Sequence, residues 1–192
     1  MQASLASLRP AFGETLGLRL LDVHVPGASS TSTQAAYASR NYTIAQGSAW
    51  RQLVEVQGFA SPVWQDPGGA SLGSAFVTAD TTNKTITIGL PEAGFGTPGP
   101  GWGFTVVLTG QDGFSPDQAR AFTATPGQFT FGVCAPGGSS SICQVAPGTV
   151  PKAMDVLTPP GVSQATELDP TQGLVAIQDV TVPSGTARDG AR

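Results

Sequence analysis

The chain has few charged residues. Asp, Glu, Lys and Arg make up 11% of its 192 residues, against about a quarter in typical soluble domains. Only Lys84 and Lys152 are lysines, and the formal net charge is -4, so no basic surface is available for a phosphate backbone. No hydrophobic run approaches the length of a membrane span. We therefore expect neither a nucleic-acid partner nor a membrane-spanning segment.

A recognisable signal peptide is also missing. Residues 1–20 lack a basic start and a continuous apolar segment. Because charged residues are few, the polar surface must come from Ser, Thr, Gln and Asn, a composition that suits secreted and wall-associated proteins. We expect the chain to be cut from a longer secreted one and to lie outside the cell or at its surface.

Cysteine occurs at two positions. Cys134 and Cys143 flank the segment A-P-G-G-S-S-S-I, in which close approach is sterically easy. This spacing favours a local disulfide, which needs an oxidising compartment. The alternative is a pair of unrelated buried thiols in a cytosolic fold.

Glycine and proline are abundant, with 25 and 16 residues, about a fifth of the chain against roughly 12% in average usage. Such a chain turns often and cannot be dominated by long helices. Its length suits one domain with a hydrophobic core. Many short strands in a single module are therefore expected.

Alternation of apolar and polar residues marks the strands. The clearest runs from Trp102 to Thr109, and in the segment 18–25 the side chains of Asp22 and His24 share one face, which predicts a half-buried strand. Residues 150–157, with Pro151 in the first turn, predict a short helix. The remaining strand candidates are 41–45, 50–57, 74–79, 85–90, 128–133 and 174–182. The expected fold is an all-β antiparallel β-sandwich over residues 1–183, with a disordered tail at 184–192.

Two sequence patterns typical of enzymes occur here without the neighbouring structure that each one needs. Gly69 to Gly73 fits G-x-S-x-G, but a strand-like segment follows Ser71, and the one histidine, His24, precedes it in the chain. Residues 94–99 fit G-x-G-x-x-G, but prolines forbid the helix that a dinucleotide needs. The carboxylates are scattered and His24 has no partner at ligand spacing. We expect no catalytic residue, no metal and no cofactor, haem included.

Several segments resemble a known family when taken in order. They are L-L-D-V-H-V (20–25), S-A-W-R-Q-L-V-E-V-Q-G-F (48–59), G-W-G-F-T-V-V-L-T-G-Q-D-G-F (101–114), A-R (119–120), V-P-K-A-M-D-V-L-T-P (150–159) and S-Q-A-T-E-L-D-P (163–170). This order is similar to the C-terminal domain of glucodextranase, which is also found in amylopullulanases and belongs to the DOMON-like β-sandwich group. Family members have further strands before the position of Leu20, so the resemblance implies that N-terminal strands are lacking here.

The resemblance implies a non-catalytic module of a secreted glycoside hydrolase that acts on α-glucans. Its partners would be a polysaccharide, either an α-glucan or a cell-wall glycan, and the catalytic domain of the parent enzyme. Attachment to the cell envelope is the related possibility. The alternative is a structural spacer that packs on the catalytic domain and hides its own aromatic residues.

The three tryptophans have different settings. Trp102 and Trp50 lie in alternating strands and are predicted to be core residues. Trp64 lies in S-P-V-W-Q-D-P-G-G, which suggests a loop that presents a flat ring beside Gln65 and Asp66, the pairing that a carbohydrate site needs. The alternative is a tryptophan folded back over the end of the sandwich.

Overall fold

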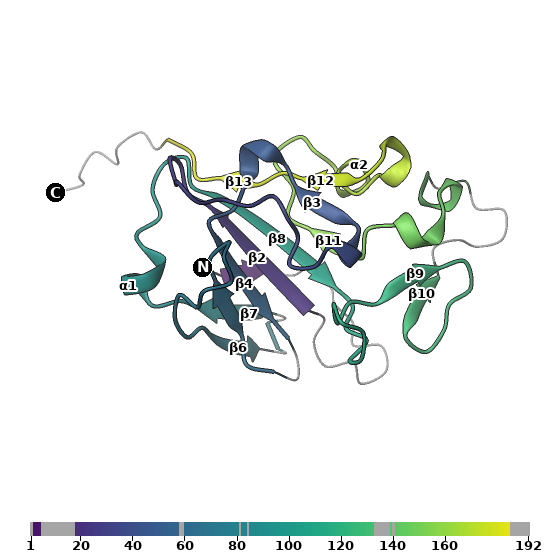
Figure 1. Cartoon of the computed structure of the whole chain (residues 1–192), viewed down its shortest axis with the longest axis horizontal. Coiled ribbons are helices and arrows are strands. Elements are labelled where there is room, and N and C mark those ends of the chain that lie inside the picture. The colour runs from purple at the N-terminus through teal and green to yellow at the C-terminus, as the bar shows by residue number, and fades with distance from the viewer. Residues whose placement is uncertain are drawn as a thin grey trace.

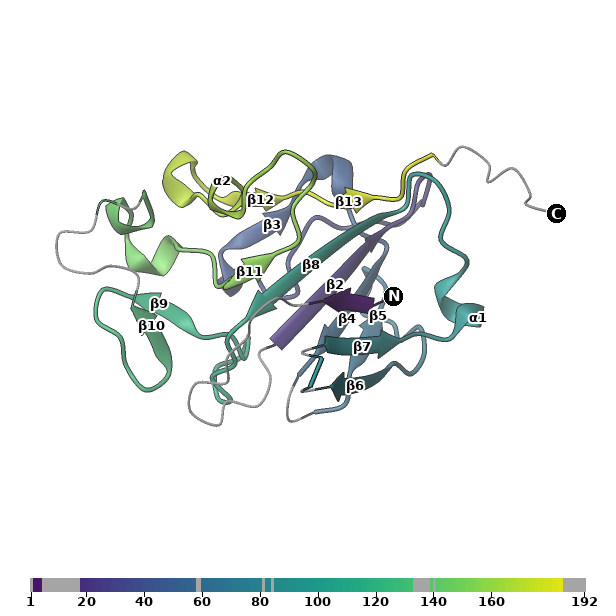
Figure 2. The ribbon, with the colours of Figure 1, turned by 180° about the vertical axis from the view of Figure 1, so that it is seen from behind.

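A computed structural model describes residues 2–4, 18–57, 60–80, 82–83, 85–132, 139 and 141–184. Its main feature is a central sheet in the order β11-β8-β2-β4-β5, with β13 also paired to β8 (Figures 1 and 2). All ladders of this sheet are antiparallel. Its strands are β2 (Leu18–His24), β4 (Gln52–Val56), β5 (Val63–Gln65), β8 (Gly103–Thr109), β11 (Asp155–Val156) and β13 (Val180–Thr181).

Three smaller sheets accompany the central one. An antiparallel sheet has the order β1-β7-β6, and the pairs β3–β12 and β9–β10 are parallel. Their strands are β1 (Gln2–Ser4), β7 (Thr85–Gly89), β6 (Phe76–Asp80), β3 (Tyr42–Ile44), β12 (Val175–Ile177), β9 (Ala121–Thr123) and β10 (Thr130–Gly132). The helical segments of the described residues are all short: α1 (Glu92–Phe95), α2 (Gln164–Glu167), η1 (Ala38–Arg40), η2 (Gln46–Ser48), η3 (Ser141–Gln144), η4 (Pro147–Thr149) and η5 (Pro170–Gln172).

The central sheet is covered on both faces. One core cluster joins it to β3 and β12, and includes Tyr42, Ile44, Leu53, Val107 and Ile177. The other cluster joins its opposite face to β6 and β7, and includes Leu21, Val23, Val54, Trp64 and Phe104, with Val77 and Ile88 packed against them. The fold is thus an all-β sandwich, as predicted, with the smaller β-layers on either side of the central sheet (Figure 1).

Burial of both faces explains one error of the sequence analysis. The strand β2 was expected to expose Asp22, yet this side chain is 3% exposed, because β3 and β12 cover its face. Similarly, all five residues of β4 are buried, including Gln52 and Glu55. Half-burial is therefore wrong for β2, and its polar side chains must find partners inside the protein.

Most predicted strands are confirmed to within a few residues. The segment 174–182 is divided into β12 and β13. The helix expected at 150–157 is wrong: Val150 follows the turn η4, and Asp155 and Val156 form β11, which pairs with β8. Ladder hydrogen bonds to the long strand β8 are available there, and a proline at position 151 does not prevent them.

Two predictions fall on residues outside the described ranges. Cys143 lies in η3, but Cys134 is not among the described residues, so the bridge between them stays a prediction. The predicted tail from residue 185 onward also lies outside them. In the described part of the chain, no helix is both long and apolar enough to cross a bilayer.

Candidate functional site

The structure places Trp64 in the strand β5 and not in a loop. Its side chain is 2% exposed, in the core cluster between the central sheet and β6–β7. The indole Nε1 donates a hydrogen bond of 3.0 Å to Oε1 of Gln52, another buried residue. A ring in this position has no face free for a sugar, so the expected display of Trp64 is not found.

The neighbours of Trp64 are engaged in local structure. Gln65 is half-buried and forms an isolated bridge with Ser71. Oδ1 of Asp66 accepts hydrogen bonds from the backbone N–H groups of Gly68 (2.8 Å) and Ala70 (2.9 Å), which closes the turn after β5. The Asp-Pro-Gly-Gly sequence therefore forms a turn, and Asp66 stabilises it. A sugar contact by Gln65 or Asp66 remains a prediction.

The other tryptophans follow the prediction more closely. Trp50 is 3% exposed and belongs to the core cluster under β3. Trp102 is partly buried against the opposite cluster, and its ring meets that of Phe95 edge to face at 5.7 Å. Neither ring is presented as a free platform.

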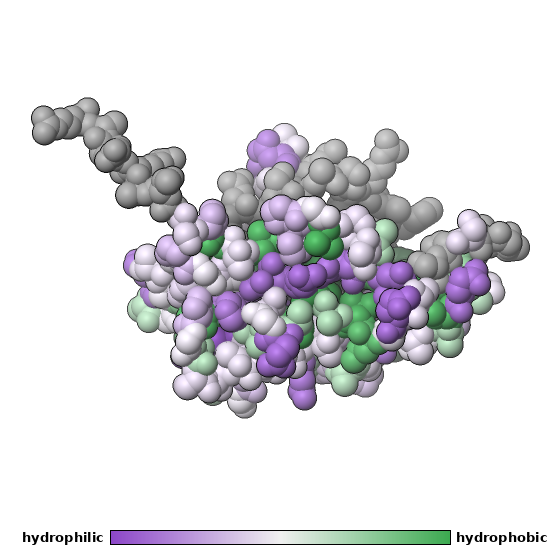
Figure 3. Space-filling model, turned by 90° about the horizontal axis from the view of Figure 1, so that it is seen from above, coloured by the Kyte–Doolittle hydropathy of each residue, from purple (hydrophilic) through white to green (hydrophobic). Residues whose placement is uncertain are grey.

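A pair of phenylalanines is displayed instead. Phe114 is 65% exposed and Phe129 is 41% exposed. Their ring centroids lie 4.9 Å apart at an interplanar angle of 76°, an edge-to-face contact. Apolar groups reach the surface of this protein in separate patches among polar residues, as the face in Figure 3 shows. Exposed aromatic rings offer apolar surface to a ligand, and aromatic side chains are common in ligand sites.

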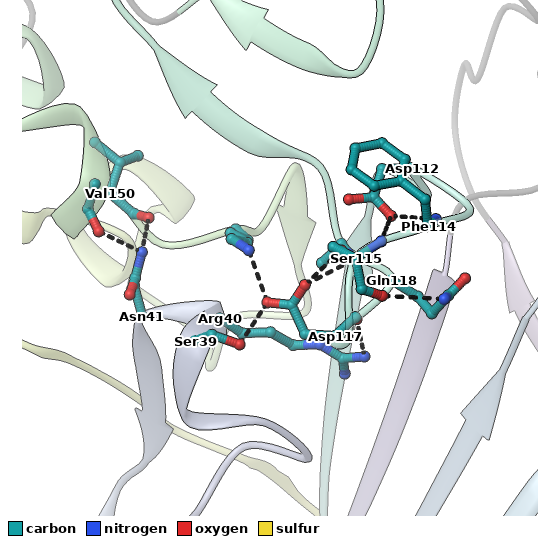
Figure 4. Close-up of polar contacts among 12 residues, drawn as sticks. Ser39, Arg40, Asn41, Asp112, Phe114, Ser115, Asp117, Gln118 and Val150 are labelled. Atoms are coloured by element: carbon teal, nitrogen blue, oxygen red, sulfur yellow. Dashed lines mark hydrogen bonds and ion pairs between the residues drawn. The ribbon is translucent and has the colours of Figure 1, made fainter.

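Phe114 is held by the loop formed by residues 111–119, here called the 111–119 loop. Its ends meet through a bridge between Gln111 and Ala119. Oδ1 of Asp112 accepts from the backbone N–H groups of Phe114 and Ser115, both at 3.1 Å (Figure 4). These bonds fix the backbone on which the Phe114 ring stands.

Asp117 anchors this loop to the rest of the protein (Figure 4). Its Oδ2 accepts from Ser39 Oγ and forms an ion pair with Lys152 Nζ, each at 2.7 Å. Its Oδ1 accepts from Ser115 Oγ at 2.9 Å and from the N–H of Ala119 at 3.3 Å. The carboxylate thereby joins the loop, η1 and the segment before β11 at one point.

The main chain of the loop is tied to the core as well. The carbonyl of Asp117 accepts a 2.8 Å hydrogen bond from Nη2 of Arg40, a side chain with no exposed surface. The same Nη2 forms an ion pair of 2.7 Å with Oε1 of Glu55 in β4. Arg40 thus links the 111–119 loop to β4 of the central sheet.

The charge of Asp117 is stabilised by these contacts. Burial alone would raise the pKa of its carboxyl group. Hydrogen bonds from Lys152, Ser39, Ser115 and the N–H of Ala119 outweigh that effect and lower the pKa to about 2. The anchor therefore stays ionised at any pH above the acid range.

A second aromatic contact supports the strands on either side of Phe129. The rings of Phe122 in β9 and Phe131 in β10 lie 5.4 Å apart, and the guanidinium of Arg120 lies 5.4 Å from the Phe131 ring. A Cβ on Gly110 would come within 2.5 Å of that ring, so Gly110 leaves room for it. These contacts pack β10 against the end of β8.

Comparison with protein families matches a model over residues 10–180. The model describes the SLH-like C-terminal binding module of glucodextranase. The chain belongs to this family. As a member of the glucodextranase C-terminal module family, it is a binding module and not a catalytic domain. No curated protein matches its sequence significantly.

The residues weighed for catalysis or metal binding have structural contacts. Among the described residues, no group of three or more His, Cys, Asp and Glu side chains is arranged to hold a metal ion. Nδ1 of His24 donates a hydrogen bond of 2.9 Å to the carbonyl oxygen of Ala49, a structural contact. Ser71 lies in a bridge next to a turn, without the strand-to-helix geometry of a nucleophile elbow.

The sequence analysis missed Phe114 and Phe129 as site residues. The dipeptide Asp112-Gly113 is a turn signal, and Gly113 has a φ of +78°. An aromatic residue directly after such a turn has no alternating apolar partners along the chain, which is the signal for display. Phe129 carried no comparable signal, because its pairing with Phe114 depends on the packing of β9 and β10.

Proposed function

We propose that this chain is a carbohydrate-binding module of a secreted glycoside hydrolase that acts on α-glucans, and that Phe114 and Phe129 form its sugar contact. The family gives a non-catalytic binding module. The observation that carries the sugar contact is the exposed edge-to-face ring pair.

The anchoring of the 111–119 loop supports this proposal. A binding surface that is already ordered loses less conformational entropy when a ligand arrives. The loop is fixed by Asp112 and Asp117 before any ligand is present. In addition, the amide of Gln118 donates to the carbonyl of Ser115 at 3.0 Å, and polar groups of this kind beside a ring suit a polyhydroxylated ligand.

A structural spacer is the competing function. Such a domain would cover its aromatic residues against the neighbouring domain or its own core. The description of the family as a binding module favours binding over a spacer. Attachment to a cell-envelope glycan uses the same chemistry and differs only in the polysaccharide.

The first test is retention of the purified chain on insoluble starch, dextran and cell-wall polysaccharide. Phe114→Ala and Phe129→Ala should each weaken binding by about tenfold, because either change removes one ring of the pair. Leu174→Ala is the matched control, since Leu174 is 67% exposed and apolar but not aromatic. Its retention should equal that of the unmodified chain.

The melting temperatures of all three variants should stay within a few degrees, because the changes are on the surface. Equal retention of Phe114→Ala and the control would contradict the assignment of the site. Retention of the unmodified chain on none of the three polysaccharides would contradict the carbohydrate-binding function.

A further inference from the structure

The outer face of the sheet β1-β7-β6 carries another exposed ring, Phe76. Its neighbour Val77 packs inward against the core, so Phe76 and Thr78 point outward. Phe76 is 60% exposed, the highest value of any aromatic residue outside the 111–119 loop in the described chain. The face to which it belongs takes no part in the site described above.

The ring of Phe76 lies flat on the sheet. Phe76 is directly opposite Gly89 in the β6–β7 ladder. A Cβ built on Gly89 would lie 1.9 Å from Cζ and 2.3 Å from both Cε atoms. With aromatic bonds of about 1.4 Å, these distances put that point above the face of the ring and not beyond its edge. One face of the ring therefore covers Gly89, and the opposite face is turned to solvent.

The strand residues on the same side as this ring bear hydroxyl groups. Thr78 is paired with Thr87, and Asp80 with Thr85, on the same outer side as Phe76. Asp80 is the one carboxylate of these strand residues. Its oxygens accept hydrogen bonds from the backbone N–H groups of Thr82 and Asn83 and from the side-chain amide of Asn83. The face thus offers an aromatic plane and threonine hydroxyls with its single charge already engaged, which matches a neutral, polyhydroxylated ligand.

We propose that this face, with Phe76 at its edge as the aromatic contact, is a second contact surface for the same neutral polysaccharide, separate from the Phe114–Phe129 pair. The proposal rests on the carbohydrate-binding function proposed above. The labels β6 and β9 lie apart in both views (Figures 1 and 2), so the two surfaces belong to different parts of the molecule. A long or insoluble polysaccharide offers many sugar units to both, and two contacts on one polymer raise its retention.

The test compares a polymer with a short ligand. Phe76→Ala should lower retention on insoluble starch or dextran about tenfold, because the second contact is lost. It should leave the affinity for maltotriose and isomaltotriose unchanged, since these bind at Phe114 and Phe129. Phe114→Ala should weaken both kinds of binding.

Two further variants separate ring stacking from strand stability. Phe76→Leu still covers Gly89 but has no flat face, so its retention should be as low as that of Phe76→Ala. Phe76→Tyr keeps the ring and should retain the polymer normally. Gly89→Ala places a Cβ where the ring lies, and the displaced ring should reduce retention without any change at position 76.

The outcomes distinguish this proposal from the binding function itself. Equal polymer retention of Phe76→Ala and the unmodified chain overturns the second surface and leaves the first intact. Absence of any glycan binding by the unmodified chain overturns both. If size-exclusion chromatography shows a dimer that Phe76→Ala abolishes, the ring joins two copies of the chain, and the proposal is also wrong.

Discussion

Trp64 shows how much a single residue's environment can differ from its local sequence. Prolines on both sides and an adjacent Asp-Pro-Gly-Gly turn suggested a displayed loop. In the structure, Trp64 instead lies in β5, the edge strand of the central sheet, and pairs with Val54 in β4. That pairing depends on a strand of three residues, too short to produce an alternating pattern, so the sequence alone could not reveal it.

The burial of Trp64 reverses what its substitution should do. Trp64→Ala should lower the free energy of unfolding by about 3–5 kcal/mol, because it leaves a cavity in the core. It also leaves the buried Oε1 of Gln52 without its 3.0 Å donor. Chemical denaturation monitored by circular dichroism measures the loss. Trp64→Phe removes the N–H but less volume, so its free energy of unfolding should fall between those of the unmodified chain and Trp64→Ala. A Trp64→Ala variant as stable as the unmodified chain would contradict the buried position.

At the scale of elements, the sequence predicted strands better than it predicted what lies on each face. Alternation located β2, β4 and β8 closely, because strand periodicity is a local property. It placed Asp22 on an open face, since it could not foresee that β3 and β12 pack over that face. The partner that makes Glu55 tolerable, Arg40, comes from a turn 15 positions away in the chain, and that contact is tertiary.

The 111–119 loop gives a prediction about an element. Asp117→Asn removes the ion pair with Lys152 and one charge-assisted acceptor of Ser39. The loop should then exchange its backbone amides faster, and the affinity for an oligosaccharide should fall severalfold as Phe114 loses its fixed position. Hydrogen exchange and calorimetric titration measure the two effects.

A matched control exists for that variant. Asp80→Asn makes the same chemical change in another turn, where Asp80 accepts from Thr82 and Asn83. It should leave both the exchange of residues 111–119 and the oligosaccharide affinity unchanged. Were Asp117→Asn to behave like Asp80→Asn, the loop would owe its order to Asp112 and the backbone alone.

For the whole molecule, the buried polar groups on the β3-facing side of the central sheet determine how stability depends on pH. Burial raises the pKa of Asp22 to about 8; the nearby charge of Arg40 opposes this shift and Glu55 adds to it. Tyr42 lies among the same groups, and burial raises its pKa too. In addition, Oδ1 of Asp22 has no hydrogen-bond partner among the described residues. At neutral pH the folded protein therefore keeps Asp22 as a neutral acid.

The direction in which stability changes with pH follows from the number of protons bound by the folded and the unfolded chain. Between pH 4 and pH 8 the unfolded chain has lost the Asp22 proton and the folded chain holds it, so the free energy of unfolding should fall as pH rises, by at most about 1.4 kcal/mol per pH unit for this group. Below pH 4 the opposite effect of Asp117 begins, because its folded pKa is about 2 and its stabilising contribution is lost as the acid protonates it. Urea denaturation from pH 2 to pH 9 should thus show greatest stability near pH 4. Asp22→Asn resembles the neutral acid and should remove most of the decline between pH 4 and pH 8, while leaving the acid side unchanged. If Asp22→Asn declines as steeply as the unmodified chain, another group is responsible, and the neutral form of Asp22 in the folded protein is refuted.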